Sequence, residues 1–176
     1  MVSRTRAQSP ARSRVIVLIA VGAAFMSGLD LFVVNVAFDQ IGVSLGVGTD
    51  GGPTIADMSW ILNIYAVVYA ALLVPLGRIA DRYGRKTVFV GGLALFVAAS
   101  AACALSGNVW MLVLFRGLQA AGAAAMTPTS LSNLMAALPP EKRIGGVRMW
   151  SATGAAAAAL GPTIGGFLTG ISWHWV

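Results

Sequence analysis

The chain has 176 residues, of which 57% are hydrophobic and 10% are charged, and its net charge is +6. A soluble domain usually carries about 25% charged residues, so this composition argues against a water-soluble protein and makes the lipid bilayer the expected solvent. The basic residues lie between apolar runs and are not interleaved with aromatic residues on a polar surface, which argues against a nucleic-acid partner.

Residues 1–14 form a basic N-terminal segment with arginines and no acidic residue. The apolar run that follows, at about 15–37, is too long for the hydrophobic part of a signal peptide, and further apolar runs come after it. We therefore expect residues 1–14 to be an uncleaved cytoplasmic tail and residues 15–176 to form a transmembrane domain.

Long apolar runs continue along the rest of the chain. They lie at about 15–37, 58–77, 87–106, 109–137 and 147–169, and a sixth begins near Trp175. About 20 residues of α-helix span the roughly 30 Å hydrocarbon core of a bilayer. The expected fold class is therefore all-α: a polytopic transmembrane helix bundle with five complete helices and the start of a sixth.

The Lys and Arg residues orient this bundle. All of them except Arg116 fall in segments on the same side as the N-terminus, and the opposite segments, at about 38–57, 107–108 and 170–174, contain none. Such a bias marks the cytoplasmic side of a membrane protein. We therefore expect a multi-pass protein of the cell membrane with a cytoplasmic N-terminus.

Tryptophans near the helix ends predict an interfacial aromatic belt. Those near outer ends are Trp60, Trp110, Trp173 and Trp175, and Trp150 lies near an inner end. His174 has no second metal ligand nearby in the sequence and is interpreted as an interfacial anchor. The single cysteine, Cys103, lies in an apolar run and is interpreted as a small apolar residue.

Two ionisable residues, Asp30 and Arg116, lie deep within apolar runs. With a rise of about 1.5 Å per residue, Asp30 should lie roughly 8 Å and Arg116 roughly 10 Å from the outer face. Charges at this depth are costly and usually functional. In one interpretation Asp30 binds a proton or a cationic substrate in a water-accessible cavity and Arg116 tunes its proton affinity. In the other, the two form a structural ion pair between the first and fourth helices.

Two further segments are unusual. Residues 77–86 concentrate charged side chains between two apolar runs, which predicts a tight polar turn between the second and third helices. In the fifth run, Gly161 and Gly165 are spaced by four residues, which predicts close helix packing. Pro162 should kink that helix, and such a helix suits either a sliding interface or ordinary tight packing.

These motifs resemble those of the major facilitator superfamily. Residues 77–86 resemble the loop between helices two and three of its transporters, and residues 112–124 resemble its fourth-helix motif. Residues 157–166 resemble the fifth-helix motif of the antiporter branch. Residues 29–37 are similar to the first-helix motif of the fourteen-helix drug:proton antiporters, with Phe32 in place of a usual Thr.

The resemblance implies an N-terminal part of a proton-coupled exporter that moves lipophilic or cationic small molecules by alternating access. Its implied partners are the substrate, protons, membrane lipid and the C-terminal half of the transporter. The residues implied for proton coupling or substrate binding are Asp30, Asn35, Arg116 and Gln119. Those implied for a cytoplasmic conformational latch are Gly77, Asp81, Arg82, Gly84, Arg85 and Lys86. Those implied for a helix-packing gate that seals against the other half are Gly161, Pro162, Gly165 and Gly166.

Other functions stay open from the sequence. The same fold serves symporters and uniporters, and a chain of this length is also compatible with a non-transporting truncated membrane protein or an assembly partner. The sequence contains no Gly-x-x-x-x-Gly-Lys-Ser/Thr loop for ATP, and no metal-ligand cluster or nucleophile–base pair that would indicate an enzyme or a cofactor site. Candidate cavity-lining residues are too generic to identify a substrate: Asn63, Tyr65, Tyr69, Met126 and Asn133.

Overall fold

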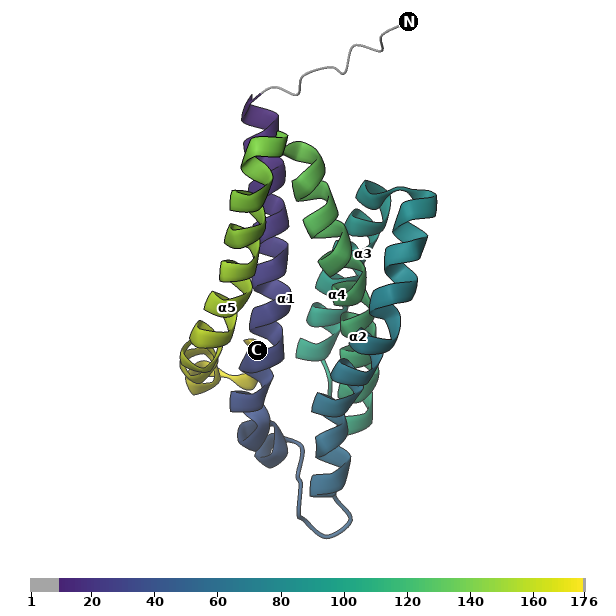
Figure 1. Ribbon diagram of the computed structural model, residues 1–176. Helices are drawn as coiled ribbons and strands as arrows, with labels where there is room; N and C mark the ends of the chain where they lie inside the picture. The colour runs from purple at the N-terminus through teal and green to yellow at the C-terminus, as the bar shows by residue number, and fades with distance from the viewer. Residues whose placement is uncertain (1–9, 176) are drawn as a thin grey trace, which may run out of the picture.

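The computed structural model describes residues 10–175 and shows an antiparallel helix bundle (Figure 1). Its elements are α1 (Pro10–Ser44), α2 (Ile55–Tyr83), α3 (Arg85–Ala104), α4 (Val109–Ala137), α5 (Pro140–Ile171) and the short 3₁₀ helix η1 (Trp173–Trp175). All five α-helices are long and apolar enough to cross a membrane, which confirms the predicted fold class.

The helices extend beyond the predicted apolar runs. Helix α1 begins at Pro10, so the last part of the predicted basic tail is helical, and residues 1–9 of that tail lie outside the described residues. Helix α1 also continues to Ser44 rather than ending near 37, and α5 begins at Pro140 rather than near 147. Polar residues at a helix end can continue the backbone hydrogen-bond ladder into the interfacial region, so hydropathy alone made these helices too short.

Local capping signals determine where two helices begin. At the start of α2, the Thr54 side chain accepts a hydrogen bond from the Asp57 amide while the Asp57 carboxylate accepts one from the Thr54 amide. At the start of α4, the Asn108 side chain accepts from the Met111 amide. These bonds satisfy amide groups that have no partner within the first helical turn.

The prediction of a tight polar turn over residues 77–86 is wrong in its extent. Helix α2 continues to Tyr83 and α3 begins at Arg85, so Gly84 alone connects them. Gly84 has φ of 100°, a conformation that side-chain-bearing residues rarely adopt. The charged residues therefore lie on helix ends at one end of the bundle, which we call the basic end.

The connections at the opposite end are residues 45–54, residues 105–108 and η1. We call it the acidic end, because Asp39, Asp50 and Asp57 lie there and no Lys or Arg does among the described residues. The predicted segregation of basic residues to one end of the bundle is therefore present in the structure.

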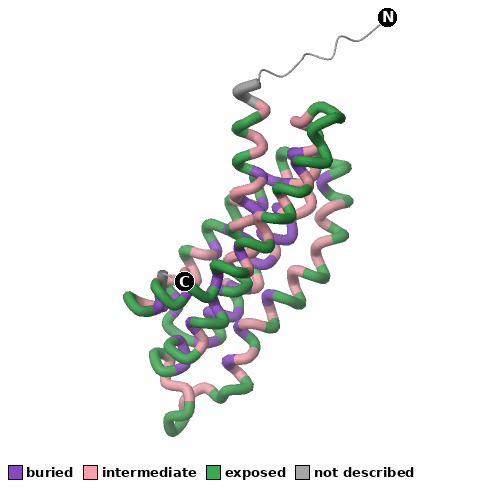
Figure 2. Tube along the Cα trace, turned by 60° about the vertical axis from the view of Figure 1, so that its left-hand side comes forward, coloured by how far each residue is buried: buried purple, intermediate pink, exposed green. Residues whose placement is uncertain are grey.

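The bundle consists of two groups of helices. Helix α1 packs mainly against α5, and α4 packs against both α2 and α3, as Figure 1 shows. The groups meet mainly where α1 contacts α4. Buried residues line these contacts while most outward positions are exposed (Figure 2). The α1–α4 contact is therefore the main junction of the molecule.

Small residues allow the close approach within each group. A Cβ atom at Gly122 of α4 would lie 2.7 Å from the Phe96 amide nitrogen of α3, and one at Gly161 of α5 would lie 2.5 Å from the Phe32 Cβ of α1. Lipid provides no hydrophobic drive for helix association, so contacts of this kind supply much of the attraction. The α3–α4 pair, built on Gly92 and Gly122, was not predicted.

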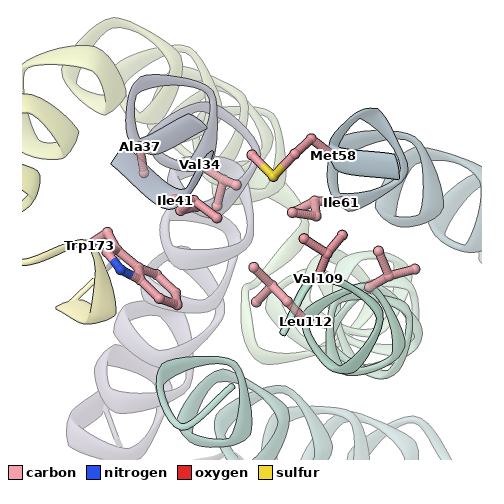
Figure 3. Packing of buried hydrophobic residues seen from close by; sticks show 9 residues of the cluster. Val34, Ala37, Ile41, Met58, Ile61, Val109, Leu112 and Trp173 are labelled. Carbon is pink, nitrogen blue, oxygen red and sulfur yellow. The ribbon is translucent and has the colours of Figure 1, made fainter. Parts of the chain in front are cut away.

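A buried hydrophobic cluster fills the acidic end, with Trp173 between α1 and α4 (Figure 3). Trp173 is only 8% exposed, so the prediction that it belongs to an interfacial belt is wrong. Trp60 and Trp110 are 47% and 59% exposed, as the belt interpretation requires. The difference arises because η1 turns back against α1 and α3 instead of continuing outward.

Candidate functional site: a buried polar cluster between α1 and α4

The two intramembrane charges meet in the structure. Arg116 Nη1 lies 2.8 Å from both carboxylate oxygens of Asp30, and their side chains are 3% and 8% exposed. The pair lies at the α1–α4 junction. Removing two charges from water is expensive, and their attraction compensates only if the geometry is good and other hydrogen bonds satisfy the remaining polar atoms.

Gln119 provides those additional hydrogen bonds. Its Oε1 accepts from Arg116 Nη1 at 2.7 Å, and its Nε2 donates to Asp30 Oδ1 at 2.8 Å and to Ser100 Oγ at 2.6 Å. Arg116 and Gln119 are three residues apart on α4, so they project from the same side of the helix. We call Asp30, Ser100, Arg116 and Gln119 the polar cluster.

Tyr65 of α2 covers the polar cluster. The Arg116 Cζ atom lies 4.3 Å from the centroid of the Tyr65 ring, and Tyr65 is 1% exposed. A guanidinium over an aromatic face is attracted by the electron density of the ring, and more so when water is excluded. Tyr65 also stacks on Tyr69, with ring centroids 6.1 Å apart.

Sequence reasoning missed Ser100 and left Tyr65 among several generic candidates. The signal for Ser100 is its spacing: Gly92, Phe96 and Ser100 recur every four residues, and the first two are buried against α4. Cys103 is also closer to the site than its apolar surroundings indicated, since its Sγ lies 3.9 Å from Gln119 Oε1.

Asn35 does not join the polar cluster. Its side chain is exposed and donates a hydrogen bond to the Leu31 carbonyl one turn earlier, at 2.8 Å. Of the four residues predicted for proton coupling or substrate binding, the structure therefore brings together Asp30, Arg116 and Gln119.

The residues predicted for a latch lie at the basic end. Arg85 Nη2 lies 3.0 Å from Asp81 Oδ1, with side chains 49% and 66% exposed. Arg82 Cζ lies 5.6 Å from the centroid of the Tyr83 ring. Gly84 forms the connection, Lys86 is exposed, and Gly77 faces Pro128 of α4.

The residues predicted for a packing gate divide into two faces. Gly161 and Gly165 are buried against Phe32 and Val33 of α1, within this bundle. Pro162 and Gly166 are exposed on the other side of α5, and a Cβ at Gly166 would meet nothing within 4 Å. Gly161 and Gly165 are thus already packed against α1 of this chain, and Pro162 and Gly166 are left exposed.

A groove of about 330 Å³ lies between the two helix groups. It is lined by α1, α2, α4 and α5, and its polar side chains include Ser27, Tyr69, Thr127 and Trp150. Tyr69 donates a hydrogen bond to Thr127 Oγ1 at 3.1 Å, and Trp150 Nε1 donates to Ser130 Oγ at 3.1 Å. Apolar walls with a few oriented polar groups are typical of small-molecule sites.

Within residues 10–175, no group of three or more His, Cys, Asp or Glu side chains could hold a metal ion. The polar cluster itself contains an ion pair, a hydrogen-bond network and one carboxylate, a group whose charge depends on proton binding.

Comparison with known proteins identifies relatives. Residues 20–176 match the family described as Major Facilitator Superfamily. The chain is 40% identical over 163 residues to the methylenomycin A resistance protein of Bacillus subtilis (strain 168), an alignment that covers 92% of the chain and 34% of that relative. It is 35% identical over 155 residues to the probable multidrug resistance protein EmrY of Escherichia coli (strain K12), covering 88% of the chain and 29% of that relative.

A third relative is the multidrug resistance protein Stp of Mycobacterium tuberculosis (strain CDC 1551 / Oshkosh). It is 36% identical over 166 residues, which is 93% of the chain and 30% of that relative. The chain thus spans about a third of the length of these relatives.

Proposed function

Because this chain belongs to the major facilitator superfamily, we propose that it forms part of a proton-coupled exporter of lipophilic or cationic small molecules. Asp30 is the group that gains and releases the proton. The observation that carries this proposal is a single carboxylate at the junction of the two helix groups, held by Arg116 and Gln119.

The location of Asp30 links proton binding to helix packing. When the carboxylate is ionised, it attracts Arg116 across the α1–α4 contact. Protonation removes that charge, while Arg116 keeps its hydrogen bond to Gln119 and its contact with the Tyr65 ring. Proton binding therefore weakens the link between the groups, and by reciprocity any movement that separates them changes the proton affinity of Asp30.

The substrate surface in this proposal is the groove between the two groups, next to the same junction. The names of the relatives support export, since they are a methylenomycin A resistance protein and multidrug resistance proteins. A groove with apolar walls and the aromatic residues Tyr69 and Trp150 suits lipophilic compounds, and aromatic faces also attract organic cations.

In the same proposal the protein lies in the cell membrane with the basic end in the cytoplasm, an orientation that the positive-inside bias supports. Asp81 is exposed, and within the described residues its ion-pair partner is Arg85 alone. It is therefore free to exchange partners with a helix end or a basic residue of the C-terminal half, which is the latch role.

The test is transport by the protein expressed at its natural length in inverted membrane vesicles. An imposed proton gradient should drive uptake of a lipophilic cationic dye such as ethidium. Asp30→Asn should abolish this uptake while dye binding persists, because the amide keeps the shape but cannot exchange a proton. Asp39→Asn is the matched control on the same helix, since Asp39 is exposed at the acidic end, and it should transport normally. If Asp30→Asn accumulates dye uphill with unchanged proton coupling, Asp30 is only a structural partner of Arg116.

A further inference from the structure

A small cavity adjoins the polar cluster on the side of the acidic end. Its volume is about 20 Å³. Its wall on the side of the polar cluster is formed by Arg116, Gln119 and Cys103. Its wall on the side of the acidic end is formed by Trp173 and His174 of η1. The remaining lining is apolar, from α1, α2, α3 and α4. The cavity therefore lies between the residues that hold Asp30 and the end of the bundle.

The cavity has the size and the polar groups that a water molecule requires. A volume of roughly 10–15 Å³ is enough for one water, which also needs two to four polar partners. Arg116 Nε is buried and has no hydrogen-bond acceptor among the described residues, and Arg116 is 3% exposed. Trp173 lines the opposite wall, and its indole Nε1 is also buried without an acceptor among the described residues. A buried donor without a partner is costly, so these atoms indicate a bound acceptor.

Trp173 is the buried side chain in the acidic-end wall of this cavity. Its indole lies against Val34 and Ile41 of α1 and Leu112 of α4, as Figure 3 shows. His174 stacks on it with ring centroids 3.9 Å apart and is exposed. Arg116 and Gln119 thus bound the cavity on its inner side, and the buried Trp173 indole and the exposed His174 bound it toward the acidic end.

We propose that the cavity is a water site that serves the polar cluster and that Trp173 is its plug toward the acidic end. The bound water accepts a hydrogen bond from Arg116 Nε. With the indole in place, the polar cluster is sealed from the water outside that end. Displacement of the short η1 segment would open a path through this half of the protein to Arg116 and Gln119. This inference rests on the proposed function, in which Asp30 needs alternating access to water.

Cys103 provides a direct test, because it is the single cysteine of the sequence and lines the same cavity. The full-length protein in intact cells is treated with a small membrane-impermeant methanethiosulfonate, and unreacted thiol is then counted with a fluorescent maleimide after denaturation. If the longer protein contains other cysteines, they are first replaced, and Cys103→Ser defines the background.

We expect slow labelling of Cys103 in the parent protein. Trp173→Ala should raise the rate at least about tenfold, because the Cys103 thiol is partly buried and a reagent from that end reaches it mainly past the indole, by local opening. Trp60→Ala and Trp110→Ala are matched controls, since both tryptophans are exposed at the same end, and both should label at the parent rate. Trp173→Phe keeps most of the apolar plug and should also label slowly.

Three results would overturn the proposal: an unchanged rate in Trp173→Ala, an equal increase in the two control variants, or rapid labelling of the parent protein. If Trp173→Ala does not fold, Trp173→Leu replaces it with the same expectation and the same overturning result. Labelling needs no transport. The labelling prediction can therefore fail while Asp30→Asn still abolishes proton coupling, and the labelling prediction can hold while Asp30→Asn leaves coupling unchanged. The two proposals are therefore tested separately.

Discussion

Within residues 10–175, two Asp–Arg pairs have the same chemistry in opposite surroundings. Asp30 and Arg116 are 2.8 Å apart with side chains 8% and 3% exposed, whereas Asp81 and Arg85 are 3.0 Å apart with side chains 66% and 49% exposed. Their distances are nearly equal, so distance does not distinguish them. Burial does, because a charge that loses its partner in the interior has no water to replace it.

The two pairs also differ in what they connect. Asp81 and Arg85 are four residues apart, on either side of Gly84, so their contact is local. Asp30 and Arg116 belong to different helix groups and to helices that are distant in sequence. The exposed pair can exchange partners at little cost, which suits the proposed latch, while the buried pair suits the proposed proton site because a change of charge there is not screened by water.

The largest expected effect comes from leaving Asp30 unpaired. Arg116→Leu should lower the free energy of unfolding by about 3–5 kcal/mol, whereas Arg85→Leu should lower it by less than about 1 kcal/mol. Thermal unfolding of the detergent-solubilised protein measures both. The double variant Asp30→Leu/Arg116→Leu should recover much of the loss, because no buried charge then remains. Equal losses in the two single variants would contradict the role assigned to burial.

The next effect concerns the contact that holds α1, the helix of Asp30, against α5. Gly161→Ala places a Cβ 2.5 Å from the Phe32 Cβ and should destabilise the protein by about 1–3 kcal/mol. Gly166→Ala, on the exposed side of the same helix, should cost nothing measurable by the same thermal unfolding, because its Cβ meets no atom within 4 Å. A large effect at Gly166 alone would show that the functional contact of α5 lies outside this bundle.

A smaller effect is expected beside the exposed pair. Gly84→Ala forces a side-chain-bearing residue to φ of 100° and should cost about 1–2 kcal/mol. Gly91→Ala in α3 is the control, since its Cβ meets no atom within 4 Å and its helical backbone favours alanine. The midpoint temperature of thermal unfolding should therefore fall in Gly84→Ala and rise in Gly91→Ala. A neutral result for Gly84→Ala would mean that the connection relaxes freely.

The smallest expected effect is at the exposed carboxylate itself. Asp81→Asn should change the free energy of unfolding by less than about 1 kcal/mol, and the difference should shrink as salt is added, because exposed charges are screened. Transport in vesicles should nevertheless fall if Asp81 latches one conformation. A variant with both normal stability and normal transport would leave Asp81 with no role beyond its local ion pair.

Hydropathy and charge were sufficient to predict five membrane helices and the basic end, because both depend on local composition. They also identified Asp30 and Arg116 as unusual, since an isolated charge in an apolar run is expensive wherever the helix packs. The prediction that they lie at similar depth agrees with their contact at 2.8 Å. Gln119 entered only through its family motif, and its hydrogen bonds to both charges could not be read from hydropathy.

Which face of each helix is inside was decided only by the tertiary structure. In lipid, the outward and inward faces are both apolar, so periodicity separates them poorly. Trp173 was assigned to the interface from its position near a helix end although it lies in the core, and Asn35 was included through the family resemblance although its side chain does not join the polar cluster. The sequence alone determined where the chain crosses the membrane and where its costly charges lie. The fold determined which helices pair and which side chains are sealed from water, because those depend on contacts between segments far apart in the chain.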